Sequence, residues 1–307
     1  MVEQTHFNDF FLPNSVVSNE QPDYFYYLLI VNSDSFSSKL TKAMWDKCKT
    51  KVCADGGANR LYDSLTETER LAYIPQFIVG DLDSVREEVV AFYTSHGTMT
   101  KEVANQDEND LDKSILLIRS MIETGGAGYA EAQWAEGSIS DKATEETTAV
   151  RTPPNPTSFP GNSCVVIMGG FGNRFDQEMA CVSSLYRWQG VFDRMLMVGR
   201  SATAELLQPG TLHRIRCIND IHFTVQEQQQ YQQEQTDGVR EGPTCGLIPL
   251  GGRVNNISTT GLQWDLTHGS LEMGVCVSSS NRILPQAPEV TVQTSEAVVW
   301  TVELHGA

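Results

Sequence analysis

The chain has no long hydrophobic run. No apolar stretch approaches the roughly 20 residues that span a bilayer, and the N-terminal residues MVEQTHFNDF lack the basic start and apolar middle of a signal peptide. These absences argue against helical membrane spans and against secretion. We therefore expect a soluble, cytoplasmic protein with no membrane partner.

Basic residues are also scarce. The 307 residues include 22 lysines and arginines against 39 aspartates and glutamates, so the formal net charge is −17. A surface with this balance repels a nucleic-acid backbone and an anionic lipid surface alike. We therefore do not expect nucleic acid as a partner.

Cysteine motifs are missing as well. The seven cysteines are odd in number and scattered, and no two have the spacing C-x-x-C. This pattern disfavours both a disulfide framework and a zinc site. We expect reduced, buried thiols.

What is present, up to about residue 208, is an alternation of short apolar runs with segments of helical period. This alternation is typical of βαβ units around a parallel sheet. The expected strands cover residues 24–31, 51–54, 76–79, 164–168 and 194–198. The expected helices contain Phe36, Leu40 and Met44, then Leu111, Ile115, Ile118 and Ile122, then residues 175–188.

Beyond Pro209-Gly210 the period changes to two. Apolar residues alternate with polar neighbours over 262–266, a THGS turn follows, and residues 271–277 alternate again, which predicts an antiparallel hairpin. Residues 298–304 repeat the pattern. The sequence thus predicts an α/β domain with a parallel sheet over residues 1–208, followed by an all-β domain over 209–307.

Two segments have the composition of insertions. Residues 123–160 are acidic and then Pro-rich, and residues 225–240 are rich in glutamine. Neither has the apolar residues to build a core, so we expect solvated loops.

Carboxylates follow several of the expected strands. Asp55 comes after the second strand with Gly56 and Gly57, Asp81 and Asp83 come directly after the third, and NQDENDLDK places Asp107 and Asp110 before a helix. A single aspartate in such a place is most often a helix cap. In an open parallel sheet, however, the carboxyl ends of the strands form the ligand site. Carboxylates that converge there without matching cations favour a hard divalent cation such as Mg²⁺, which also binds phosphate.

A glycine-rich loop follows the fourth strand. IMGGFGNRFDQEM contains Gly169, Gly170 and Gly172, then Arg174, whose guanidinium suits phosphate, and Asp176 at a helix start. The sequence contains neither G-x-G-x-x-G nor the Walker pattern G-x-x-x-x-G-K-[ST]. The loops together indicate nucleotide phosphate chemistry that uses neither of these two motifs.

These stretches resemble one known family. ADGGANRLYD, VGDLDS, QDENDLDK, GGFGNRFDQEMA, CGLIPLGG, TTGLQWDL and VSSSN follow one another in the order found in eukaryotic thiamin pyrophosphokinases, and more specifically those of fungi. The motif QDENDLDK departs from the family pattern, because Asn109, Leu111 and Asp112 stand where the family tends to carry Thr, Phe and Thr.

The resemblance implies an activity and a set of roles. The family transfers the pyrophosphoryl group of ATP to thiamin, with an α/β domain that binds Mg-ATP, a β-sandwich-like domain that helps to bind thiamin, and a homodimer with active sites between subunits. By motif position, the residues implied on the nucleotide side are Asp55, Gly56, Asp81, Asp83, Asp110, Lys113, Gly170, Arg174 and Asp176. Asp55, Asp81, Asp83 and Asp110 would hold Mg²⁺, and Asp81, Asp110 and Arg174 would be catalytic. Those implied on the thiamin side are Gln106, Trp264, Ser278 and Asn281.

Other interpretations stay open at this stage. On residue pattern alone Trp264 would be a core tryptophan, and Ser278 and Asn281 an ordinary turn. The carboxylate site would also suit another Mg-dependent nucleotidyltransferase or a nucleotide hydrolase. A non-catalytic regulator that binds thiamin or a nucleotide is the third possibility.

Overall fold

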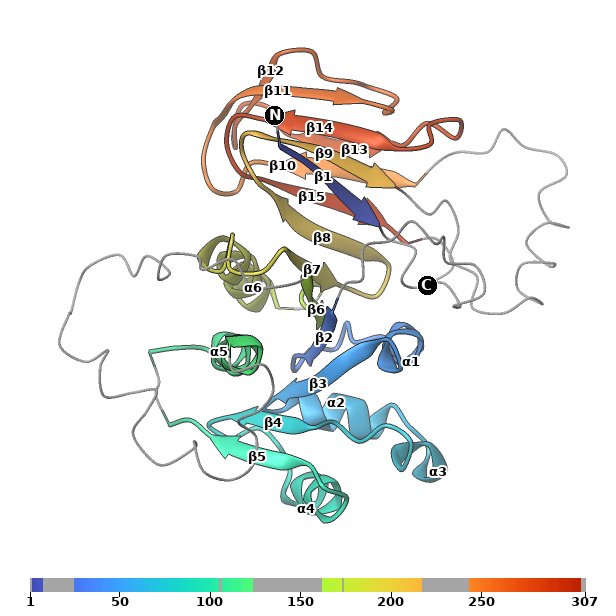
Figure 1. Ribbon diagram of the computed structural model, residues 1–307, viewed down its shortest axis with the longest axis vertical. Coiled ribbons are helices and arrows are strands. Elements are labelled where there is room, and N and C mark those ends of the chain that lie inside the picture. Colours follow the sequence, from blue (N-terminus) through green and yellow to red (C-terminus); the bar gives the residue numbers. More distant parts are fainter. Residues whose placement is uncertain are drawn as a thin grey trace, which may run out of the picture.

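The computed structural model describes residues 2–7, 25–104, 107–123, 162–172, 174–216 and 243–304. Over these residues the chain forms a large mixed sheet with helices on both faces, and a second sheet beside one end of it (Figure 1). Gln106, Cys217 and nearly all of both expected insertions lie outside the described residues.

The large sheet has the strand order β13-β10-β15-β8-β7-β6-β2-β3-β4-β5. Its parallel part consists of β2 (Phe25–Ile30), β3 (Cys48–Ala54), β4 (Phe77–Gly80), β5 (Met99–Glu102), β6 (Ser163–Met168) and β7 (Arg194–Val198). Its antiparallel part consists of β8 (Ala202–Leu207), β10 (Thr244–Ile248), β13 (Ser278–Arg282) and β15 (Val298–Glu303).

The second sheet has the order β1-β9-β14-β11-β12. Its strands are β1 (Val2–Phe7), β9 (Thr211–Arg216), β11 (Val254–Thr260), β12 (Gly269–Leu271) and β14 (Val290–Thr294). A core between this sheet and the antiparallel part of the first includes Leu247, Ile257, Val292 and Trp300. The C-terminal strands thus form a β-sandwich together with β1.

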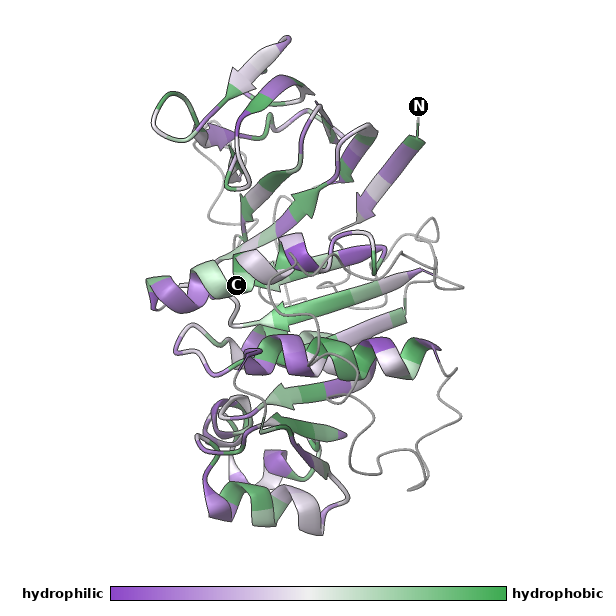
Figure 2. Cartoon of the chain, turned by 90° about the vertical axis from the view of Figure 1, so that its left-hand side faces the viewer, coloured by the Kyte–Doolittle hydropathy of each residue, from purple (hydrophilic) through white to green (hydrophobic). Residues whose placement is uncertain are grey.

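Helices cover both faces of the parallel strands. They are α1 (Ser38–Trp45), α2 (Gly57–Asp63), α3 (Glu67–Arg70), α4 (Glu87–Ser95), α5 (Asp110–Glu123) and α6 (Phe175–Arg187). One core contains buried residues of α1, α2 and α4, and the core on the other face contains those of α5 and α6. In Figure 2 the strands between these layers are mostly apolar, which is expected of parallel strands covered on both sides. None of the helices in the described ranges is both long and apolar enough to cross a membrane.

The sequence predicted this fold class correctly. All five expected parallel strands and all three expected helices are present, and the antiparallel β region follows them. The boundary between the domains at residue 208 stays a prediction, because the large sheet continues through β8 into the antiparallel strands. In addition, β1 pairs in parallel with β9, so the first strand joins the second sheet.

The predicted hairpin at 262–277 is wrong. The hairpin is formed one segment earlier by β11 and β12, with Val254 opposite Leu271 and Ile257 opposite Gly269. Residues 262–268 form an isolated bridge and turns, and Met273 and Val275 are exposed rather than part of an alternating strand. An alternating pattern fits any segment with one buried side, so it does not say which segments pair. The segment that pairs with β12 is the longer run 254–260.

The expectation for the cysteines is confirmed for five of them. Cys48, Cys53, Cys164, Cys181 and Cys245 are buried and unbridged, whereas Cys276 is exposed.

Candidate active site

A cleft of about 670 Å³ opens at the carboxyl edge of the parallel strands. Its lining comes from the loops after β2, β3, β4 and β6 and from α5 and α6. The strand order places β3 on one side of β2 and β6 on the other, so the chain reverses its winding direction here. Ligands of open α/β sheets bind at such a switch point.

Three of the four expected metal ligands converge in this cleft. Carboxylate oxygens of Asp55, Asp81 and Asp110 all lie within 4.8 Å of one another. Asp83 is not part of this group; its exposed carboxylate accepts a hydrogen bond from the Ser84 hydroxyl at 2.9 Å.

Asp55 faces the cleft and also binds the backbone of a neighbouring loop. It is 3% exposed, and its two carboxylate oxygens accept hydrogen bonds from the backbone amides of Ser84 (3.2 Å) and Val85 (3.1 Å). The loop after β4 is therefore tied to the loop after β3, which brings Asp81 to Asp55.

Gly80 leaves room for these carboxylates. A β-carbon at this position would lie 2.7 Å from the Asp55 Cβ and 3.0 Å from Asp110 Oδ1, and the first distance is shorter than packed carbon atoms allow. A side chain at residue 80 would therefore push the carboxylates apart.

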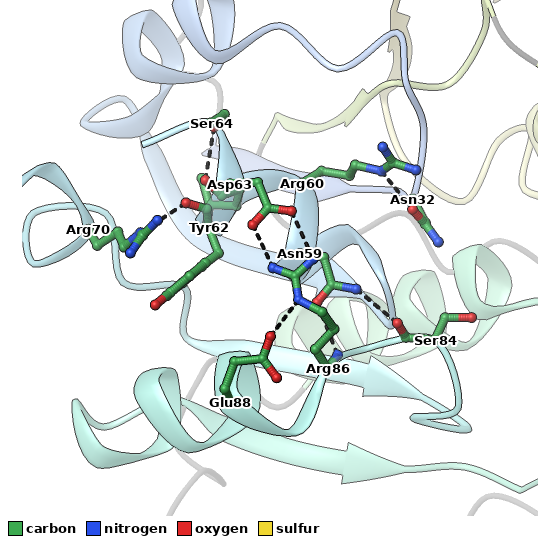
Figure 3. A network of polar contacts seen from close by, with 11 residues as sticks. Asn32, Asn59, Arg60, Tyr62, Asp63, Ser64, Arg70, Ser84, Arg86 and Glu88 are labelled. Atoms are coloured by element: carbon green, nitrogen blue, oxygen red, sulfur yellow. Dashed lines mark hydrogen bonds and ion pairs between the residues drawn. The ribbon is translucent and has the colours of Figure 1, made fainter. Parts of the chain in front are cut away.

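A polar network supports the loop from the side of α2 and α4 (Figure 3). The Asn59 side chain donates to the Ser84 carbonyl (2.8 Å) and accepts from the Arg86 amide (3.1 Å). The Arg86 guanidinium in turn donates to both oxygens of Asp63, one of them at 2.9 Å. The ADGGANR motif thus supplies both a carboxylate of the cluster and the amide that holds the neighbouring loop.

Asp110 and Lys113 form an ion pair inside the cleft. The Lys113 Nζ donates to Asp110 Oδ1 at 3.0 Å, and the lysine side chain is buried. Burial raises the pKa of Asp110, Lys113 opposes this, and the charges of Asp81 and Asp55 add to it. Three carboxylates against one lysine leave an excess of negative charge in a partly buried place.

The glycine-rich loop lines the same cleft as the carboxylates. Gly169 and Gly170 line the cleft, and Gly169 has a φ of +83°, which a side chain would strain. Arg174 also lines it and donates through Nε to Asp176 Oδ1 at 3.1 Å. Both side chains are mainly exposed, so they lie at the mouth rather than at the base.

Sequence reasoning missed the loop after β2. Asn32, Ser33 and Asp34 line the cleft. Arg60 of α2 holds two of them, donating to Asn32 Oδ1 at 2.8 Å and to Asp34. The sequence held a signal for this loop as part of the site, because its residues directly follow an expected strand. Gly56, the residue before α2, faces Asn32, since a β-carbon there would lie 2.4 Å from Asn32 Nδ2.

The residues implied for thiamin lie elsewhere in the chain. Trp264 is 57% exposed, so the interpretation of it as a core residue is wrong. Asn281 is buried, and its side chain makes two hydrogen bonds to the Trp264 backbone. It accepts one from the amide (3.1 Å) and donates one to the carbonyl (2.9 Å). The Asn281 amide also reaches Ser278 Oγ at 3.4 Å. None of these three is among the described residues that line the cleft, and Gln106 lies outside the described residues.

The donor set in the cleft fits Mg²⁺. All the converging ligand atoms are carboxylate oxygens, which a hard cation prefers, and sulfur or imidazole ligands are not among the described residues of the cluster. The excess negative charge is what a divalent cation would neutralise.

Two family models match the chain. "Thiamin pyrophosphokinase, catalytic domain" matches residues 41–197, and "Thiamin pyrophosphokinase, vitamin B1 binding domain" matches residues 222–299. The first match contains the three converging carboxylates and Arg174, and the second contains Trp264.

Named relatives agree with these models. Thiamine pyrophosphokinase 3 of rice, Oryza sativa subsp. japonica, is 30% identical, covering 91% of this chain and 87% of its own length. The thiamine pyrophosphokinase of Saccharomyces cerevisiae is 27% identical, with 90% and 85% covered. The structure of thiamin pyrophosphokinase from Candida albicans superposes with a TM-score of 0.75 at 26% identity, covering 98% and 93% of the two chains. The eukaryotic resemblance is thus confirmed, the fungal part of it stays a prediction, and the chain belongs to the thiamin pyrophosphokinase family.

Proposed function

We propose that this chain transfers the pyrophosphoryl group of ATP to the hydroxyl of thiamin, giving thiamin diphosphate and AMP, and that the cleft at the switch point binds Mg-ATP. The observation that carries this proposal is the convergence of Asp55, Asp81 and Asp110 at the edge of the sheet, within the stretch that matches the family's catalytic domain.

The reaction needs positioning and charge neutralisation more than it needs covalent chemistry. The thiamin hydroxyl attacks the β-phosphorus in line, the bond from that phosphorus to the α-phosphate oxygen breaks, and AMP leaves. The chain must therefore align the two substrates and stabilise negative charge that moves toward AMP.

Asp55, Asp81 and Asp110 would hold Mg²⁺ in the cleft. When bound, Mg²⁺ neutralises phosphate charge and orients the triphosphate. Asp83 would act from the loop tip on the ATP side. Asp81 and Asp110 are both candidates to accept the proton of the thiamin hydroxyl.

Cationic groups flank the carboxylates. Lys113 is buried beside Asp110, where it can approach a phosphate oxygen, and Arg174 lies at the mouth of the cleft. We propose that Arg174 stabilises the negative charge that develops on the leaving group, because a guanidinium presents two donors to phosphate oxygens. Gly56, Gly170 and Asp176 complete the ATP side.

Thiamin is assigned to the β domain. The exposed face of Trp264 would stack on the thiazolium cation, a contact worth about 0.5–2 kcal/mol. Asn281 holds the Trp264 backbone in place, and Ser278 and Gln106 would contribute polar contacts. Since the thiamin side lies apart from the cleft, we propose a homodimer in which each active site combines the two sides from different subunits. Met273 and Val275, a few residues before Ser278 in the chain, are exposed apolar side chains, which supports contact of this segment with a partner subunit.

The decisive experiment incubates the protein with ATP, Mg²⁺ and thiamin and separates the products by chromatography. Stoichiometric thiamin diphosphate and AMP are expected, and none without Mg²⁺. AMP or ADP formed equally well without thiamin would instead indicate a nucleotide hydrolase or another nucleotidyltransferase. Binding of thiamin or ATP without turnover would indicate a regulator.

A cytoplasmic location is part of the proposal. The five buried, unbridged cysteines support a reducing compartment. Fractionation of cells followed by immunodetection tests it, and recovery in an organelle fraction would contradict it.

A further inference from the structure

Asp112 is a buried carboxylate that joins α5 to α6. It is 3% exposed. Its Oδ1 accepts hydrogen bonds from the Ser184 hydroxyl (2.8 Å) and from Trp188 Nε1 (2.7 Å), and its Oδ2 accepts one from Arg187 Nη1 (2.7 Å). Two donors from α6 and one from Trp188, which directly follows it, thus meet on a single side chain of α5.

These contacts lie near the start of α5 but near the end of α6. Asp112 lies in the first turn of α5, where its amide donates to the Asn109 side chain at 2.8 Å. Its partners lie at the C-terminal end of α6 and just beyond it. The first turn of α5 is therefore level with the end of α6, and the N-terminal part of α6 extends beyond it.

That N-terminal part lines the cleft through Gln177 and Glu178, next to Arg174. Residues 174–177 are all exposed, whereas Cys181, Ser184 and Leu185 are buried against the rest of the fold. The direction of α6 is accordingly set by its second half. A rise of about 1.5 Å per residue places Phe175 about 13 Å along the axis from Ser184, so a tilt of about 5° shifts the helix start by about 1 Å.

We propose that Asp112 is a positioning residue that sets the place of Arg174 relative to Asp110 and Lys113. Asp110 and Lys113 are in the same helical turn as Asp112, and Arg174 directly precedes α6. The contacts of Asp112 therefore connect the carboxylate side of the nucleotide site with its arginine side. The inference rests on the proposed function, in which both sides contact Mg-ATP.

A carboxylate suits this place better than an amide. All three partners donate, and a carboxylate only accepts. In Asp112→Asn one oxygen would become an NH₂ group that faces a donor, and Arg187 would lose its charged partner. The helices would still be packed through their apolar faces, but their relative tilt would be less restrained. A misplacement on the order of 1 Å can cost about 100-fold in rate.

The test compares Asp112→Asn and Arg187→Gln with a matched control, Arg119→Gln. Arg119 is on α5 as well, but its ion pair with Glu123 at 2.8 Å stays within that helix. Turnover is measured against Mg-ATP and against thiamin at 20 °C. Binding of a non-hydrolysable Mg-ATP analogue and thermal unfolding are measured in parallel.

We expect Asp112→Asn to lower kcat/KM for Mg-ATP by about 10- to 100-fold while the KM for thiamin changes less than about two-fold. Arg187→Gln removes one of the three contacts and should have a smaller effect in the same direction. Since the two residues share a contact, the double variant should lose little more than Asp112→Asn alone. Arg119→Gln should match the unsubstituted protein.

A purely structural role predicts a different result. Asp112→Asn would then unfold at a lower temperature but keep its kinetics and analogue affinity at 20 °C, which would overturn the proposal. If Asp112→Asn does not fold, Arg187→Gln carries the test, and unchanged kcat/KM for Mg-ATP in that variant is equally contrary. If the unsubstituted protein makes no thiamin diphosphate, the proposed function fails, and analogue affinity still decides whether Asp112 positions the nucleotide site.

Discussion

Asp55 and Leu82 have backbone conformations that side chains seldom adopt. Their φ values are +43° and +62°, in the left-handed region, which costs roughly 1–2 kcal/mol for a residue with a β-carbon. Asp55 is held there by the amides of Ser84 and Val85. The shape of the site is thus imposed by contacts between loops rather than by local preference.

Asp81→Asn tests the carboxylate cluster at the level of one residue. Loss of one negative charge from three converging carboxylates should lower turnover by about 100-fold, by analogy with the removal of one electrostatic stabilising group, and leave the fold intact. Asp83→Asn, outside the cluster and exposed, should cost about 10-fold or less. Turnover at saturating Mg-ATP and circular dichroism decide; near-normal turnover of Asp81→Asn would refute the metal site.

Gly80→Ala tests the space between the carboxylates. The added methyl group would overlap the Asp55 side chain, so we expect a loss of about 1–3 kcal/mol of unfolding free energy together with at least about 10-fold in turnover. Urea denaturation measures the first quantity, and chromatographic measurement of thiamin diphosphate formation measures the second.

Gly97→Ala is the matched control for Gly80→Ala. Gly97 has a positive φ of +96°, as Gly80 has one of +159°, but nothing lies within 4 Å of the β-carbon added at Gly97. It should lose about 1 kcal/mol of stability and no activity. Equal activity losses in the two variants would show that backbone strain, and not crowding of the carboxylates, is responsible.

At the scale of elements, a buried polar cluster attaches β1 to the rest of the molecule. His6 Nδ1 donates to Glu205 Oε2 at 3.0 Å, and Arg194 Nε donates to the same oxygen at 2.8 Å. His213 Nε2 donates to the Gln208 carbonyl at 2.8 Å, so a neutral His213 carries no proton on Nδ1, which lies 2.9 Å from His6 Nε2. Burial opposes ionisation of Glu205, but Arg194 and His6 outweigh it and lower its pKa.

This cluster predicts acid sensitivity. Burial lowers the pKa of His213 from 6.5 to about 4. Between these values the unfolded chain binds a proton that the folded chain does not, so stability is complete above pH 6.5 and falls as the pH drops toward 4. The expected slope is about 1.4 kcal/mol per pH unit. Urea denaturation at several pH values measures it.

His213→Gln should flatten that slope between pH 6.5 and 5, whatever its effect on absolute stability. Glu205 is not expected to interfere there, since its stabilisation is lost only below its unfolded pKa of 4.5. The exposed His96 serves as control, and His96→Gln should leave the slope unchanged. An unchanged slope in His213→Gln would contradict the assignment.

At the scale of the whole molecule, the residues proposed for ATP and those proposed for thiamin lie in different layers. The carboxylates belong to the parallel sheet, whereas Trp264 follows β11 of the sandwich and does not line the cleft. A two-fold dimer would create two equivalent composite sites.

Complementation between inactive variants tests the shared site. As homodimers, Asp81→Asn should be nearly inactive, and Trp264→Ala, assayed at limiting thiamin, should lose up to about 30-fold in activity with the loss of its contact. In a mixed dimer one composite site would carry both substitutions and the other neither, so co-expression should restore up to about half of normal activity per heterodimer. If each site is built within one chain, purified heterodimers will show no gain, and the pyrophosphokinase assignment will stand without the shared site.

The sequence by itself determined the class of fold and the kind of chemistry. Apolar periodicity is local, so the runs at 24–31 and 164–168 predicted their strands correctly. Because parallel strands end at a common edge, aspartates after successive strands predicted a shared carboxylate site. The family motifs then specified the substrates.

Only the tertiary structure decided which residues meet. It selected Asp55, Asp81 and Asp110 from the four expected ligands, because backbone amides of the loop after β4 bind Asp55. It placed the hairpin at β11 and β12, and it brought Asp112 to donors more than 70 residues away. Such pairings depend on how whole layers pack, and spacing along the chain carries no record of them. Local periodicity therefore predicts elements, whereas long-range packing determines the geometry of the site.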